Sequence, residues 1–134
     1  MNRLGSESLL LAATLAEIRR RLGVDADDLL RSVGRRIGAA CAGPPSDDLA
    51  AVQAWMTDIW TTLDMGGVEL SGEGGILRLT HRLPSPSLER RQWSDMLPSV
   101  IEGVYEDWLA RLDGRGQLVL RSSDEQGLEF TYGV

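Results

Sequence analysis

The sequence has no lysine, and all 14 of its basic side chains are arginines. Without lysine the chain cannot form a Schiff base through a lysine side chain, and it cannot supply the lysine of a phosphate-binding P-loop. It has a single histidine, His81, and a single cysteine, Cys41. One cysteine excludes an internal disulfide, and one histidine excludes a metal site built from several histidines of the same subunit.

Long apolar runs are also missing. No stretch approaches the roughly 18 apolar residues that a membrane-spanning helix needs. Leu9–Ala13 faintly resembles the apolar part of a signal peptide, but the stretch is short and Glu7 interrupts its basic flank. We therefore expect this segment to belong to the mature protein and the protein to be cytoplasmic.

Length and charge narrow the class of protein. A chain of 134 residues with 43% hydrophobic and 25% charged residues is typical of one soluble domain, so we treat residues 1–134 as a single domain. The net charge is −6, divided into +2 over residues 1–43 and −8 over residues 44–134. An acidic chain without a long basic stripe is a poor candidate for binding nucleic acid.

The N-terminal half reads as helices. Apolar spacing predicts helices over residues 6–22, about 26–41 and about 47–64, the first of them stopped by Gly23. We expect Asp25 to cap the second helix and Ser46 the third, because both residue types favour that position. The buried side of the third helix should carry Leu49, Val52, Met56, Ile59, Trp60 and Leu63.

After residue 66 the helical spacing of apolar residues gives way to an alternation of apolar and polar residues. Residues 68–70 and 76–80 predict a β-hairpin with its turn at 71–75, and residues 117–122 and 128–133 predict a second hairpin. A helix should reach from within the segment Trp93–Leu109 to about Leu112. The fold class that follows is α+β with an antiparallel sheet.

The segment Trp93–Leu109 is the most apolar helix of the set. Its apolar residues recur at offsets of three and four, which predicts a wide packing or assembly surface with the acidic side chains toward solvent. Trp93 and Tyr105 are candidate contacts of that surface. The apolar residues are Leu97, Ile101, Val104, Tyr105 and Trp108, and the acidic ones are Glu102, Glu106 and Asp107.

Two glycines interrupt the second helix. Gly34 and Gly38 are four residues apart and therefore share a face. Glycine inside a helix costs about 1 kcal/mol relative to alanine, and it is typical of places where another backbone approaches closely. We expect an interhelical or intersubunit contact there.

Candidate chemical groups are few. His81 stands beside Arg82 at a strand end and is interpreted as a hydrogen-bonding structural residue, with a general base as the less favoured reading. Gly72–Gly75 joins two strands instead of opening a helix, so it does not match a phosphate-binding loop. Trp60 is expected in the core, whereas Trp55 and Trp93 fall at edges where they suit a subunit contact or a ligand.

Four segments together resemble a known family. In order and spacing they are similar to the D subunit of bacterial cellulose synthase, also called cellulose synthase operon protein D, and the resemblance covers about residues 10–134. The segments are Leu29–Gly38, Met65–Leu70, Leu79–Pro84 and Trp93–Trp108.

The resemblance implies a non-catalytic accessory scaffold of cellulose biosynthesis without a cofactor. Members of the family form a ring-like homo-octamer, a tetramer of dimers, whose inner passages accommodate β-1,4-glucan chains. They organise the synthase complexes so that chains align and crystallise, together with a proline-rich accessory protein of the cellulose operon. The family implies that N-terminal segments line the glucan passage, here Asn2, Arg3, Ser6 and Glu7. The expected location is the cytoplasm near the inner membrane, with the periplasm as the alternative.

Two other classes stay open at this stage. One is a sensor module that binds a small ligand or haem, with His81 as the axial ligand. The other is a glycosidase that uses Asp95 and Glu102 as paired acids. Seven residues on a straight helix separate such a pair by roughly 10 Å, which is long even for an inverting enzyme.

Overall fold

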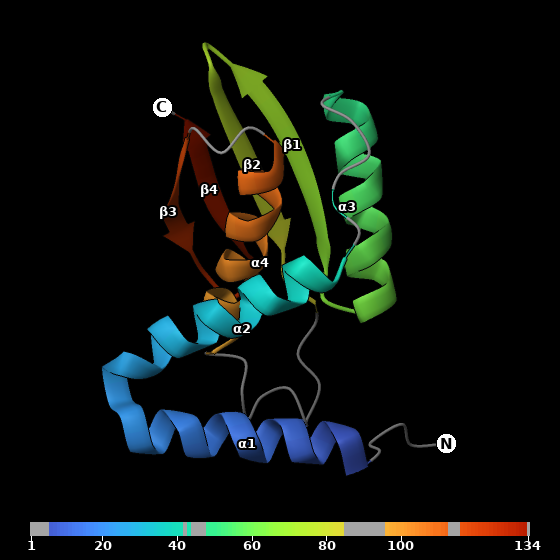
Figure 1. Ribbon diagram of the computed structural model, residues 1–134. Helices are drawn as coiled ribbons and strands as arrows, with labels where there is room; N and C mark the ends of the chain where they lie inside the picture. The colour runs from blue at the N-terminus through green and yellow to red at the C-terminus, as the bar shows by residue number, and fades with distance from the viewer. Residues whose placement is uncertain (1–5, 42, 44–47, 85–95, 113–115, 134) are drawn as a thin grey trace.

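The computed structural model describes residues 6–41, 43, 48–84, 96–112 and 116–133. Within these ranges the chain forms helices and one antiparallel four-stranded sheet, so the predicted α+β class is confirmed. Figure 1 shows α4 lying across one face of the sheet, α3 beside β1, and α1 and α2 forming a V below them. The elements are α1 (Ser6–Leu22), η1 (Gly23–Asp25), α2 (Ala26–Ala40), α3 (Leu49–Leu63), β1 (Gly67–Glu73), β2 (Ile76–Arg82), α4 (Leu97–Leu112), β3 (Gln117–Ser123) and β4 (Gly127–Gly133).

The turn between α1 and α2 is built by glycine. Gly23 has φ +59°, a left-handed conformation that glycine adopts without steric cost, and α1 ends there as predicted. Asp25 stands at the N-cap position of α2 as predicted, but its side chain does not accept the expected hydrogen bond from the start of the helix. Residues 23–25 already form the 3-10 turn η1, so the Asp25 backbone is helical instead of extended as in most capping residues.

The start of α3 also differs from the prediction. Asp48 is the cap, since its carboxylate accepts a hydrogen bond from the Ala51 amide at 3.3 Å. Ser46, the predicted cap, lies outside the described residues. Asp64 ends the helix with φ 55°, a conformation that aspartate tolerates better than most side chains.

The buried face of α3 is narrower than the sequence predicted. Val52, Met56 and Trp60 are buried, but Leu49 and Leu63 are 38% and 41% exposed. These two leucines occupy the first and last positions of the helix. In the middle of α3 the Gln53 side-chain oxygen accepts a hydrogen bond from the Leu70 amide at 2.8 Å, which holds the helix along β1.

The sheet has the order β1-β2-β4-β3, with every pair antiparallel. Both predicted hairpins are present with longer strands, and the first turn shrinks to Gly74 and Gly75, whose φ angles are positive. In the second turn the Asp124 carboxylate accepts hydrogen bonds from the Gln126 and Gly127 amides. Alternate residues of β2 and β4 face α4, namely Leu77, Leu79, His81, Leu128, Phe130 and Tyr132.

Helix α4 is the centre of the core, so the apolar surface predicted for it is a packing surface within its own chain. Tyr105 and Trp108 are fully buried, as are Ile101, Val104 and Leu109. The predicted solvent side is wrong, because the acidic side chains Glu102, Glu106 and Asp107 are only 19%, 33% and 17% exposed. Helix α2 covers that side of α4, and α4 is therefore packed between α2 and the sheet (Figure 1).

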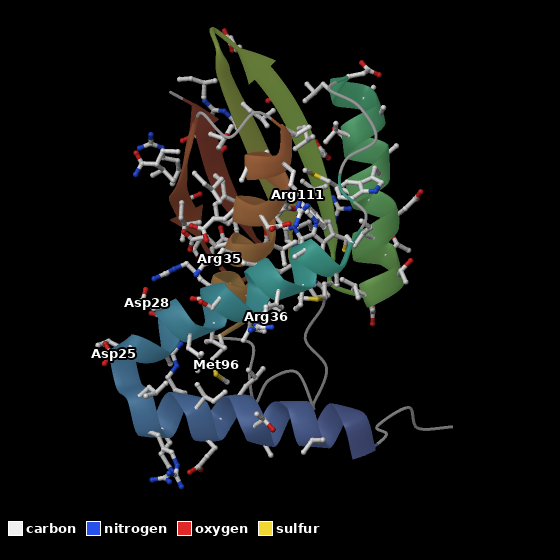
Figure 2. All side chains as sticks on the ribbon, in the orientation of Figure 1. Asp25, Asp28, Arg35, Arg36, Met96 and Arg111 are labelled. Atoms are coloured by element: carbon white, nitrogen blue, oxygen red, sulfur yellow. The ribbon has the colours of Figure 1, made fainter. Side chains whose placement is uncertain are left out.

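Helix α1 reaches the rest of the described chain through a second, smaller cluster. Leu15 and Ile18 contact Ala26, Leu30, Met96 and Val100. Figure 2 shows Met96 in the space between α1 and α2. None of the described helices has the length and apolar character to cross a bilayer.

Candidate functional site

The crossing of α2 and α4 is the tightest contact between helices. A Cβ atom placed on Gly34 would lie 2.9 Å from the Gly103 Cα and closer still to the Val100 carbonyl oxygen. A Cβ on Gly103 would lie 3.0 Å from the Arg31 Cα. The two backbones therefore touch, and a side chain at either position would separate them. The sequence-predicted close approach at Gly34 lies within one subunit, and its partner Gly103 was not predicted.

Gly38 sits one turn further along the same crossing. A Cβ there would lie 2.9 Å from the Asp107 Cβ and 3.1 Å from the Val104 carbonyl oxygen. These overlaps are smaller than the one at Gly34, although the position of the Asp107 Cβ is fixed by its backbone. Gly38 is therefore a tolerant position compared with Gly34.

Ion pairs flank the crossing and account for the partial burial of the α4 acids. Arg35 contacts Glu106 at 2.8 Å, and Arg111 contacts Asp107 at 2.8 Å. Arg31 lies 3.8 Å from Glu102 and also pairs with Asp28. Burial raises the pKa of Glu102, and the Arg31 charge opposes that rise. Figure 2 shows Arg35 extending from α2 toward α4.

His81 lies in the core with both ring nitrogens engaged. Its Nε2 donates to the Met65 carbonyl oxygen at 2.8 Å, so its Nδ1 accepts from the Tyr105 hydroxyl at 2.6 Å. Trp60 packs edge-on against both rings, with centroids 4.7 Å from His81 and 5.5 Å from Tyr105. The prediction of a hydrogen-bonding structural histidine is confirmed.

This arrangement keeps His81 neutral. Burial lowers its pKa to about 4, and the hydrogen bond to Met65 acts in the opposite direction. Burial also raises the pKa of Tyr105 well above its ordinary value, so the hydroxyl keeps its proton. An axial haem ligand needs a free ring nitrogen and open space beside it. His81 offers neither, and the sensor alternative loses its ligand.

The other predicted site residues divide into two groups. Tyr105 is fully buried and belongs to the core, so it is not available to a second subunit. Asn2, Arg3 and Trp93 lie outside the described residues. Ser6 and Glu7 open α1, but their side chains also lie outside what the structure describes.

The paired-acid alternative finds no support among the described residues. Asp95 lies outside them, and Glu102 faces Arg31. Within the part of the chain that the structure describes, no group of three or more histidine, cysteine, aspartate or glutamate side chains could hold a metal ion.

An apolar groove of about 450 Å³ lies between the last turns of α2 and the outer side of α3. Asp58 and Thr62 supply its polar edge, where the Thr62 hydroxyl donates to the Asp58 carbonyl oxygen at 2.9 Å. The sequence did not reveal this groove, because its walls come from two helices whose packing cannot be read from either one alone. Its apolar lining is Ile37, Ala40, Cys41, Trp55, Ile59 and Leu63.

Two groove residues connect it to the core. Trp55 packs edge-on against Trp108 with centroids 4.9 Å apart, so the groove wall continues the aromatic core. The Cys41 thiol donates to the Ile37 carbonyl oxygen at 3.4 Å, and burial raises its pKa. Cys41 is therefore a protonated, weakly nucleophilic thiol at neutral pH. Among its described residues the groove offers shape and apolar contact and no activated group.

Comparison with known proteins gives the family. The chain is 28% identical over 127 residues to a protein of Komagataeibacter xylinus named cellulose synthase operon protein D, and the match covers 90% of this chain and 81% of that protein. The sequence model of the family described as the D subunit of cellulose synthase matches residues 7–133. That match takes in every element from α1 to β4 except the first residue of α1. The chain belongs to this family of cellulose synthase D subunits.

Proposed function

We propose that this protein is a non-catalytic scaffold of bacterial cellulose biosynthesis. It forms a ring-like homo-oligomer, an octamer built from dimers, which organises synthase complexes and helps nascent β-1,4-glucan chains align and crystallise. The observation that carries the proposal is the family match over residues 7–133, nearly the whole chain.

The chemistry of the described residues agrees with a scaffold. His81 is neutral and fully hydrogen-bonded, Cys41 is protonated, and the half-buried acids of α4 face arginines. General acid–base or nucleophilic catalysis needs a reactive group poised beside open space. The groove, by contrast, is open but apolar, which suits recognition of another surface.

The start of the chain is the proposed glucan contact. Asn2, Arg3, Ser6 and Glu7 carry amide, guanidinium, hydroxyl and carboxylate groups, all able to exchange transient hydrogen bonds with sugar hydroxyls. The proposed partners are the synthase complex and the proline-rich accessory protein of the operon, on the cytoplasmic side near the inner membrane. Fusions to alkaline phosphatase, which is active only after export, test this location: an inactive fusion is expected, and an active one places the protein in the periplasm.

Complementation tests the function directly. The gene for protein D is deleted in Komagataeibacter xylinus, and this chain is expressed in its place. We expect cellulose yield and crystallinity to recover, and light scattering of the purified protein to give a mass several times the 14.7 kDa of one chain. A soluble chain that stays monomeric and restores neither yield nor crystallinity would overturn the proposal.

The glucan contact has its own test. Deleting residues 2–7 removes the proposed contact while leaving the described core from Leu15 onward intact. We expect unchanged thermal stability and unchanged oligomer mass, with lower cellulose crystallinity. If crystallinity is unaffected by the deletion, the passage residues are assigned wrongly even though the scaffold stands.

A further inference from the structure

Aromatic rings form a continuous series from the apolar groove into the core, which we call the aromatic series and define as Trp55, Trp108, Tyr105 and His81. Trp55 packs edge-on against Trp108 with centroids 4.9 Å apart, and Trp108 packs edge-on against Tyr105 at 5.7 Å. The Tyr105 hydroxyl donates to His81. We propose that the series is a path for one-electron oxidation, in which an electron lost at Trp55 is replaced from Tyr105 while the Tyr105 proton passes to His81. This inference goes beyond the proposed scaffold and does not depend on it.

The rings of the series are close enough for electrons to move between them. Tryptophan and tyrosine are the most easily oxidised aromatic side chains, and ring centroids about 4.5–7 Å apart are typical of aromatic contact. A parallel branch runs through Trp60, whose centroid lies 5.3 Å from Trp108 and 5.5 Å from Tyr105. Every step from the groove to Tyr105 therefore joins two oxidisable rings in contact.

Trp55 is the point at which an oxidant in solution meets the series. Its side chain is partly exposed in the part of the chain that the structure describes, and it lines the groove. Trp60, Tyr105 and Trp108 are fully buried. The oxidant is a one-electron acceptor such as a peroxyl radical, which becomes an anion when it takes the electron. An oxidation that begins at Trp55 then moves inward through the buried rings.

His81 supplies the base that oxidation of Tyr105 requires. A tyrosine that loses an electron becomes a very strong acid, and Tyr105 is buried too deeply to release its proton to bulk water. The neutral His81 ring presents its Nδ1 lone pair to the Tyr105 hydroxyl at 2.6 Å. The proton therefore needs to cross only this one hydrogen bond, and it can do so as the electron leaves.

The oxidised pair keeps its hydrogen bonds, so the surrounding packing does not need to change. Tyr105 becomes a neutral phenoxyl radical whose oxygen accepts from the new Nδ1–H of His81, while Nε2–H still donates to the Met65 carbonyl oxygen. Burial disfavours the imidazolium form of His81 and lowers its pKa to about 4, but oxidised tyrosine is a far stronger acid. A one-electron reductant such as ascorbate reverses the step, and the proton returns from His81 to the Tyr105 oxygen.

Light-driven oxidation tests the path. A ruthenium tris(bipyridine) complex, excited beside a cobalt(III) pentaammine complex that accepts one electron, becomes a ruthenium(III) oxidant that removes one electron from the protein. Transient absorption follows the formation of the protein radical, and electron paramagnetic resonance after freezing identifies it. All proteins carry Trp93→Phe, so that the three tryptophans of the described chain remain. We expect a tyrosyl radical in this parent, whereas a radical confined to tryptophan would overturn the proposal.

The chain has only two tyrosines, Tyr105 and Tyr132, so the radical can be assigned by a matched pair of variants. Tyr105→Phe and Tyr132→Phe each remove one hydroxyl. The Tyr132 hydroxyl donates to the Leu109 carbonyl oxygen at 3.4 Å, and a peptide carbonyl is a far weaker base than imidazole. We expect Tyr105→Phe to abolish the tyrosyl signal and Tyr132→Phe to leave it intact. A signal that is lost with Tyr132→Phe instead would show that Tyr105 is not the end of the path.

His81→Gln separates the base from the hydrogen bond. The glutamine side-chain oxygen can accept from the Tyr105 hydroxyl, but an amide does not take up the proton. We expect the tyrosyl radical to form more slowly by about tenfold or more, with circular dichroism showing that the fold is retained. Independently of any variant, the radical of the parent should form more slowly in heavy water, because the proton moves with the electron. An equal rate in heavy water would overturn the transfer to His81.

Trp55→Phe tests the entry point, because phenylalanine fills similar space but is oxidised far less readily. We expect the Tyr105 radical to form several-fold more slowly. The control is Trp60→Phe, which removes only the parallel branch and leaves the contact between Trp108 and Tyr105, so its effect should be smaller. An unchanged rate in Trp55→Phe would overturn the proposed path. None of these outcomes bears on the self-association measured for the scaffold, so the two proposals fail separately.

Discussion

The substitution Gly34→Ala tests the backbone contact between α2 and α4. The added Cβ would lie 2.9 Å from the Gly103 Cα and closer still to the Val100 carbonyl oxygen, and neither atom belongs to a side chain that can rotate away. The helices must therefore separate. Overpacking costs about 1–3 kcal/mol, and the rigid neighbours place this site at the upper end. Alanine regains up to about 1 kcal/mol of helix propensity, so we expect a net loss of roughly 2 kcal/mol.

Gly38→Ala is the matched control on the same helix and the same face. Its Cβ would meet the Asp107 Cβ at 2.9 Å and the Val104 carbonyl oxygen at 3.1 Å, which are smaller overlaps than the one with the Val100 carbonyl oxygen at Gly34. The propensity gain should then offset most of the strain, leaving a change of about 1 kcal/mol or less. Each variant adds one methyl group to the same face of α2. The difference between their stabilities therefore reports the cost of disturbing the backbone contact at Gly34.

Urea unfolding measures both variants. All proteins are compared at one concentration, because the proposed self-association would make apparent stability depend on concentration. A loss of about 2 kcal/mol at Gly34 with an unchanged dependence on urea is the expected result. If Gly34→Ala is as stable as the parent or more stable, the helices have room for a side chain and the described contact is wrong.

Other predictions concern the core and the sheet edge. The free energy of unfolding should fall as the pH drops from about 6.5 toward 4. In this range His81 binds a proton in the unfolded chain but stays neutral in the folded protein, where its pKa is about 4. The full effect is roughly 3 kcal/mol, and His81→Gln should remove this pH dependence in urea titrations. Gln53→Leu should cost about 1–3 kcal/mol by leaving the Leu70 amide without its acceptor, whereas Ala54→Leu on the exposed side of α3 should be nearly neutral in the same assay.

Local patterns predicted the elements well because local chemistry determines them. Gly23 ends α1 through its own conformation, and alternation in β2 and β4 follows from the period of a strand. The cap of α3 was misplaced by two residues because Ser46 and Asp48 are equally suitable types. Which of these two residues caps α3 depends on the residue at which the chain begins the helix.

The environment of α4 could not be predicted in the same way. Its acids look like a solvent face from spacing alone, but Arg31 and Arg35 of α2 approach from a helix about 70 residues earlier in the chain. Likewise, the partner of His81 is a tyrosine on another element. Such pairings depend on how helices cross, and a single sequence does not encode that crossing in a readable pattern. The apolar groove was missed for the same reason.

The contact of α2 with α4 has a consequence for the curvature of any assembly. A closed ring requires each copy to be turned from the last by one fixed angle, and small errors add up around the circle. At Gly34 and Gly103 the backbones of α2 and α4 are in contact. The angle between these two helices therefore cannot be adjusted by the movement of a side chain between them. If the protein forms the proposed ring, mild changes at this crossing should alter the size of the ring, or open it into a helical filament, before they unfold the subunit.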